Sequence, residues 1–182
     1  ARGELVAVVQ PSKLQLQEQR LQLQPLVVDV LGGRVTANGV VDLNEVAAKS
    51  GRSPPIRLAL NARGVRWQAS DGATAIHGDA DVGIAGTPER WAVKGQARLR
   101  RGGERATVAL AGRGDRARLQ VDALQARMPQ GQLDATGVVA WSPHLQWQAD
   151  ATLAGFDPGY FAPDWPGAVR GTIGAALLRP SR

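Results

Sequence analysis

The sequence contains no cysteine and few aromatic residues, and both absences restrict the structures it can form. Without cysteine there is no disulfide, no thiolate metal site and no reactive thiol. Aromatic residues make up only 4% of the 182 residues, whereas hydrophobic residues make up 43%. A packed β-sandwich of this length uses more Phe, Tyr and Trp for its bulk. The composition therefore favours a thin wall or an open groove lined by Ala, Val and Leu.

A long hydrophobic run is also missing. The longest lies near residues 25–31, far short of the roughly 18 residues that a membrane-spanning helix requires. The chain begins with Ala1, and Met128 is its only methionine, so we expect a piece of a longer protein. We expect residues 1–182 to form a single β-rich module, since β folds of this length need not be divided.

The net charge of +6 comes mainly from arginine, which raises the question of an anionic partner. Most arginines occupy the polar positions of alternating segments, such as Arg34, Arg57 and Arg118, or lie in turns, such as Arg113. This scatter favours a solvated outer face over a phosphate-binding patch, and we expect no nucleic-acid partner. A polyanion-binding β-domain is the weaker alternative, and its binding would fall steeply with added salt.

Apolar and polar residues alternate almost from end to end of the chain, which is typical of strands with one apolar face. The pattern predicts strands at residues 4–10, 13–17, 20–31, 34–43, 56–69, 74–85, 91–100, 105–111, 116–126, 132–141, 145–153 and 169–178. Gly-rich and Pro-containing turns separate them, and no interval is long enough for a parallel crossover. We expect an antiparallel meander, with a loop and one short helical turn in residues 44–55.

Part of the sequence is repeated. Residues 21–43 align with residues 119–141 without a gap, and the matches include Leu21 with Leu119, Gly33 with Gly131 and Gly39 with Gly137. Each copy has the pattern strand, turn, strand, and a further strand follows. Repeats of this kind build sheets that extend along one axis. The alternative is that the two segments are similar only because generic hairpin sequences converge.

Catalytic and metal-binding constellations are absent from the sequence. The two histidines are His77 and His144, and only His77 has nearby acids, Asp79 and Asp81. These three alternate along one strand at about 6 to 7 Å intervals, which is too far apart for a closed metal site. There is no phosphate-binding loop or nucleophile elbow. We therefore expect no enzyme activity, no metal and no cofactor.

Three segments resemble a known family. They are the hairpin at residues 26–43, its copy ending at residues 135–141, and residues 155–167, which contain Asp157-Pro158 and Pro163-Asp164-Trp165-Pro166-Gly167. Together they resemble the TamB family of bacterial translocation and assembly modules, within the AsmA-like/TamB superfamily. The resemblance implies an all-β fold: an elongated antiparallel sheet in the periplasm, curled into a taco-like open trough with a hydrophobic interior and tethered to the inner membrane.

The resemblance also implies a role. Its implied ligands are phospholipid acyl chains, its implied partner in the full-length protein is the outer-membrane barrel TamA, and its implied function is phospholipid transport between the membranes and outer-membrane biogenesis. The alternative function is a scaffold that binds unfolded outer-membrane strands by β-augmentation.

Strand parity gives the residues that would line such a groove. They are Leu21, Leu23, Val35, Ala37, Val41, Ile56, Leu58, Leu60, Val82, Ile84, Val93, Leu99, Val108, Leu110, Leu119, Val121, Leu133, Val139, Leu145, Trp147, Leu153 and Ile173. A bulge would flip the parity of the strand that contains it. Trp91, Trp141 and Trp165 lie near strand ends, where we expect them to cap the sheet.

Overall fold

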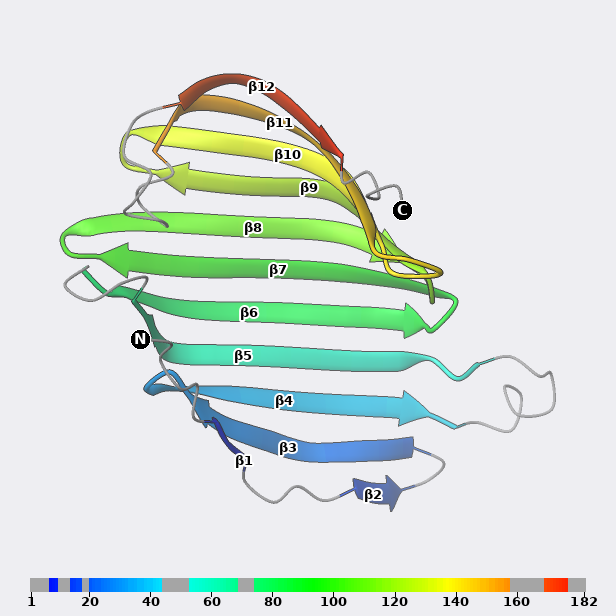
Figure 1. The fold of residues 1–182 in the computed structure, drawn as a ribbon. Helices are drawn as coiled ribbons and strands as arrows, with labels where there is room; N and C mark the ends of the chain where they lie inside the picture. Colours follow the sequence, from blue (N-terminus) through cyan, green and yellow to red (C-terminus); the bar gives the residue numbers. More distant parts are fainter. Residues whose placement is uncertain are drawn as a thin grey trace.

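Every part of the chain that can be described belongs to one antiparallel sheet or to its turns (Figure 1). The computed structural model describes residues 7–9, 14–17, 20–43, 53–68, 74–157 and 169–176. They contain no helix, so none of them forms a helix able to cross a membrane. The predicted helical turn after residue 44 and the predicted capping residue Trp165 lie outside the described residues.

The sheet is 12-stranded, as the alternating pattern predicts. The strands are β1 (Ala7–Val9), β2 (Leu14–Gln17), β3 (Arg20–Val30), β4 (Gly33–Asp42), β5 (Ile56–Trp67), β6 (Ile76–Thr87), β7 (Arg90–Arg101), β8 (Glu104–Gly114), β9 (Arg118–Met128), β10 (Gly131–Ala140), β11 (Gln146–Phe156) and β12 (Val169–Ala176).

The strands follow one another in chain order, which makes the sheet a meander. β1 and β2 both pair with the outer edge of β3, and from β3 to β12 each strand pairs with the next. No pairing among the described strands closes the sheet, so the predicted open, all-β architecture is confirmed. At about 4.8 Å per strand, the sheet extends ~48 Å across its strands.

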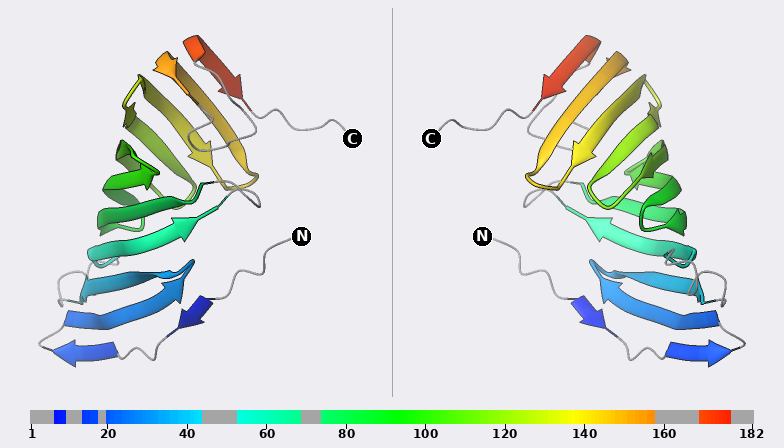
Figure 2. Two further views of the ribbon diagram at one scale, coloured as in Figure 1. Left: turned by 90° about the vertical axis from the view of Figure 1, so that its left-hand side faces the viewer. Right: turned by 90° about the vertical axis from the view of Figure 1, so that its right-hand side faces the viewer.

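The sheet is curled and twisted rather than flat. Figure 2 shows β10, β11 and β12 leaning over one of its faces. The registers place apolar side chains on this inner face and polar side chains on the outer face, because partners directly opposite each other share a face. In β7 the outer residues are exposed and the inner residues are at least partly buried, in strict alternation.

The repeat in the sequence is also a repeat in the structure. In β3 and β4 the register shifts between Leu23 and Leu26, opposite Gly39 and Ala37. In β9 and β10 it shifts at the aligned positions, with Val121 opposite Gly137 and Leu124 opposite Ala135. Bulges increase strand twist, so the two copies bend the sheet in the same way at the same place.

The third strands of the two copies match as well. The register of β5 shifts around Gly64 and that of β11 around Gly155. Both glycines adopt the left-handed conformation, with φ of 64° and 62°, which an L side chain rarely adopts. The repeated unit is therefore β3–β5 and β9–β11, with β6–β8 between the two copies.

The turn between β8 and β9 lies later in the chain than the sequence predicts. Residues 112–115 have the composition of a turn, but β8 continues to Gly114. A Cβ added at Gly114 would overlap Cζ2 of Trp91, so this glycine makes room for an indole on the neighbouring strand rather than for a turn.

The molecule has very little buried core. Among the described residues, the buried hydrophobic side chains are Ile76, Val93, Ala106, Ala126 and Leu153. The apolar face of the sheet is therefore largely uncovered.

Candidate functional site

The candidate site is the inner face of the sheet, where apolar residues form rows that run across the strands. Two rows run from β3 to β11 through Leu21, Val41, Ile56, Gly86, Trp91, Gly114, Leu119, Val139 and Trp147, and through Leu23, Gly39, Leu58, Ile84, Val93, Gly112, Val121, Gly137 and Ala149. The two adjacent rows are Leu26, Ala37, Leu60, Val82, Gly95, Leu110, Leu124, Ala135 and Ala151, and Val28, Val35, Ala62, Ala80, Ala97, Val108, Ala126, Leu133 and Leu153. No charged or polar side chain interrupts them. We call this surface the trough.

The registers bring the predicted groove residues together on this one face, apart from Leu145. Leu99 lies in the next row, between Gly78 and Ala106, and Ile173 pairs with Ala151 at the β12 end. Leu145 precedes β11 and is exposed, outside any strand. Whether these residues contact a ligand remains a prediction.

Sequence parity missed several residues of the trough. Leu26, Val28 and Leu124 belong to the rows, although their numbers have the opposite parity to the predicted residues of the same strands. The bulges in β3 and β9 cause the shift. The bulge in β3 had a signal in the sequence, which is Pro25, because proline within a strand marks an edge strand or a bulge.

Large side chains of the trough remain open to solvent. Leu58 and Leu60, in the middle of the trough on β5, each keep 38% of their surface exposed. Trp67 and Trp147 on the same face are also exposed. Exposed apolar patches of this extent are unusual in monomeric proteins and mark contact sites.

Glycines in the rows keep the lining shallow. A Cβ built at Gly39 would lie 2.7 Å from Cδ2 of Leu58, and one at Gly78 would lie 2.8 Å from Cδ2 of Leu99. These leucines therefore lie sideways over their glycine neighbours. At these positions of the described strands the wall therefore has low relief.

The outer face is held by exposed ion pairs between neighbouring strands. Arg34 pairs with Asp29 at 2.7 Å, and Arg127 pairs with Asp134 at 2.9 Å. Asp81 accepts hydrogen bonds from Arg63 and Asn61, which together hold the pKa of its carboxyl below the usual value. Exposed pairs of this kind contribute little stability each, but they favour this register over a slipped one.

A polar cluster ties the loops together at the strand ends on one edge of the trough. Glu89 accepts hydrogen bonds from Ser53 and Arg116, and its pKa is lowered to about 2, mainly by the Ser53 hydroxyl. The indole N–H of Trp91 donates to the Asp115 carbonyl at 3.1 Å, and that of Trp141 donates to the Arg116 carbonyl at 2.8 Å. Both tryptophans thus fasten the loop between β8 and β9. Trp91 was expected only to cap the sheet, but its register with Gly86 and Gly114 also places it in a row of the trough.

The histidine and aspartates considered for a metal or acid–base site do not form one. His77, Asp79 and Asp81 lie in succession on the outer face of β6. Asp79 accepts a hydrogen bond from the backbone N–H of Gly64 at 2.8 Å, and Asp81 is engaged by Arg63. Within the described residues there is no group of three potential metal ligands.

Comparison with known proteins identifies one family. The family model for the N-terminal domain of TamB matches residues 47–176, which is most of the chain and includes the strands from β5 to β12. No curated protein and no solved structure matches the chain.

Proposed function

Because the chain belongs to the TamB family, we propose that its trough holds phospholipid acyl chains and shields them from water as they move between membranes. The observation that supports this most is the set of uninterrupted apolar rows across the strands, from β3 to β11. We further propose that the module works without catalysis in the periplasm. It acts there as part of a protein tethered to the inner membrane and partnered by the barrel TamA.

The physics of the lining suits transport rather than tight binding. Each methylene removed from water contributes up to about 0.8 kcal/mol, so an acyl chain in a row gains from any position along it. The described rows consist mainly of Ala, Val, Leu and Gly, and glycines such as Gly39 keep their relief low. A chain can therefore shift from strand to strand at a small cost per step.

The proposal is tested by site-specific photocross-linking to a radiolabelled phospholipid. A photoreactive residue at Leu110 projects into the trough, whereas the same residue at Ala109, one position earlier on β8, projects from the outer face. We expect lipid adducts at position 110 and few at position 109. Equal labelling at the two positions would contradict the proposal.

A second candidate function rests on the open edges of the sheet. Among the described strands, β12 pairs on one side only, with β11. An unpaired edge can add an extended peptide by β-augmentation. Binding of this kind would protect backbone amides of β12 from hydrogen exchange when an outer-membrane strand peptide is added, and polar substitutions in the trough would leave it unchanged.

A further inference from the structure

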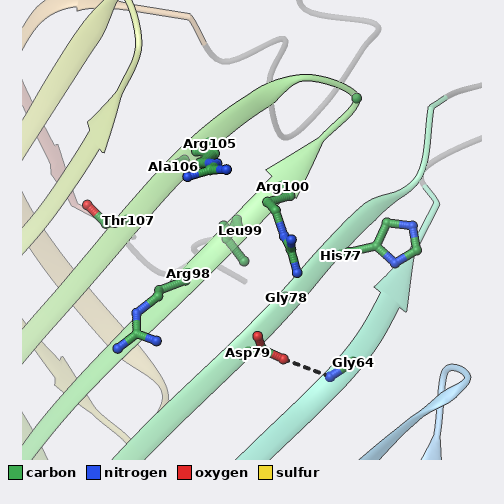
Figure 3. A pocket seen from close by; sticks show the side chains of 11 residues that line it. Gly64, His77, Gly78, Asp79, Arg98, Leu99, Arg100, Arg105, Ala106 and Thr107 are labelled. Carbon is green, nitrogen blue, oxygen red and sulfur yellow. Dashed lines mark hydrogen bonds between the residues drawn. The ribbon is translucent and has the colours of Figure 1, made fainter.

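The outer face carries a basic hollow that the trough does not use. It lies over β6, β7 and β8 beside the Gly102 turn, and has a volume of about 740 Å³ (Figure 3). The side chains that line it from the outer face are His77, Asp79, Arg98, Arg100, Arg105 and Thr107. Its lining therefore contains three arginines and one carboxylate.

The registers concentrate cationic side chains in one row at this hollow. Arg66 on β5 is opposite His77 on β6, His77 is opposite Arg100 on β7, and Arg100 is opposite Arg105 on β8. Side chains directly opposite each other are about 5 Å apart at Cβ, and like charges there destabilise the sheet. The side chains of Arg100 and Arg105 therefore repel each other unless a negative charge neutralises them.

Several arginines elsewhere on the outer face have carboxylate partners, whereas the arginines of this row do not. Arg34, Arg63 and Arg127 each have an aspartate partner. Among the described residues, Arg66, Arg100 and Arg105 have no ion pair, and Asp79 already accepts the N–H of Gly64. No carboxylate of the described residues therefore neutralises the charge of this row.

We propose that this hollow binds a phosphate group, with Arg100 and Arg105 as its main ligands. Guanidinium groups bind phosphate oxygens through paired, charge-assisted hydrogen bonds, and the Thr107 hydroxyl adds a further donor at the edge of the hollow. The phosphate can belong to a lipid headgroup or to a soluble ion. The site is on the opposite face from the trough and does not depend on lipid binding there.

The experiment compares the 182-residue chain with the variants Arg100→Gln, Arg105→Gln and Arg57→Gln. Arg57 lies on the outer face of β5, away from the hollow, so Arg57→Gln removes the same charge as a matched control. Phosphorus NMR and thermal shift measure binding of inorganic phosphate in a chloride buffer. Flotation with vesicles of phosphatidylcholine, alone or with phosphatidylglycerol, measures binding to headgroups.

The expected result is that Arg100→Gln and Arg105→Gln each weaken binding about tenfold, equivalent to about 1.4 kcal/mol, while Arg57→Gln leaves it unchanged. Without ligand, both variants should melt at or above the temperature of the parent chain, because a like-charge pair is removed.

The two arms identify the source of the phosphate. Saturable binding of inorganic phosphate assigns a soluble ion, whereas binding confined to phosphatidylglycerol vesicles assigns a lipid headgroup. Absence of binding in both arms, or equal loss in all three variants, would overturn the proposal.

Discussion

Replacing Leu58 and Leu60 by glutamine is expected to weaken acyl-chain binding without unfolding the sheet. Full burial of a leucine side chain contributes about 1.5–3 kcal/mol, and each of these keeps 38% of its surface exposed. Covering that fraction with an acyl chain would contribute roughly 0.6–1.1 kcal/mol per leucine. The double variant should therefore bind a chain lying over β5 with about 7- to 40-fold lower affinity.

The assay is displacement of a fluorescent fatty acid, read beside a urea unfolding curve. Ala59→Gln is the matched control, because residue 59 lies between the two leucines but faces outward. We expect Ala59→Gln to bind like the parent chain. Undiminished binding by a folded double variant would refute the assignment of the ligand to this face, as would an equal loss in Ala59→Gln.

Three further predictions concern stability. The pKa of Glu89 is lowered from 4.5 to about 2. The ionised carboxylate therefore stabilises the fold above pH 4.5, and this stabilisation is lost as the pH falls towards 2. In a series of melting curves over this pH range, the Glu89→Gln variant should lack this part of the pH dependence. Gly114→Ala forces a methyl group against Trp91 and should lower the free energy of unfolding in urea by about 1–3 kcal/mol. Gly103→Ala is the control, because Gly103 has open space around it, and it should change the free energy of unfolding by less than about 1 kcal/mol. Gly64→Ala places a side chain at φ +64° and should cost about 1–2 kcal/mol; a neutral effect would show that the bulge relaxes.

The strands and their shared face were predictable because alternation with a period of two is a local signal. The predicted strand at residues 91–100 became Arg90–Arg101, and the antiparallel order follows from turns too short for a crossover. The family was predictable from the two copies of the hairpin together with residues 155–167, and it was confirmed by the match to residues 47–176.

The parts of the trough that could not be predicted depend on contacts between strands. The bulge after Leu23 moves Leu26 onto the inner face, and its position is set by the register with β4 rather than by β3 alone. The role of Gly114 depends on Trp91, which is distant in sequence. The row of Arg66, His77, Arg100 and Arg105 exists only once four strands are in register, so it could not be predicted from arginines that are scattered along the chain.

The scarcity of aromatic residues and the open trough have one physical cause. A sheet that curls around its apolar face closes into a packed core when large side chains fill the space, and here the rows contain mainly Ala, Val, Leu and Gly. The wall must then be stabilised along the strands, through backbone pairing and cross-strand neighbours, rather than through a second layer. Repeated bulges at aligned positions keep the curl regular. The scarcity of large side chains, which keeps this sheet from closing into a packed core, is thus also what leaves its apolar face free for a ligand.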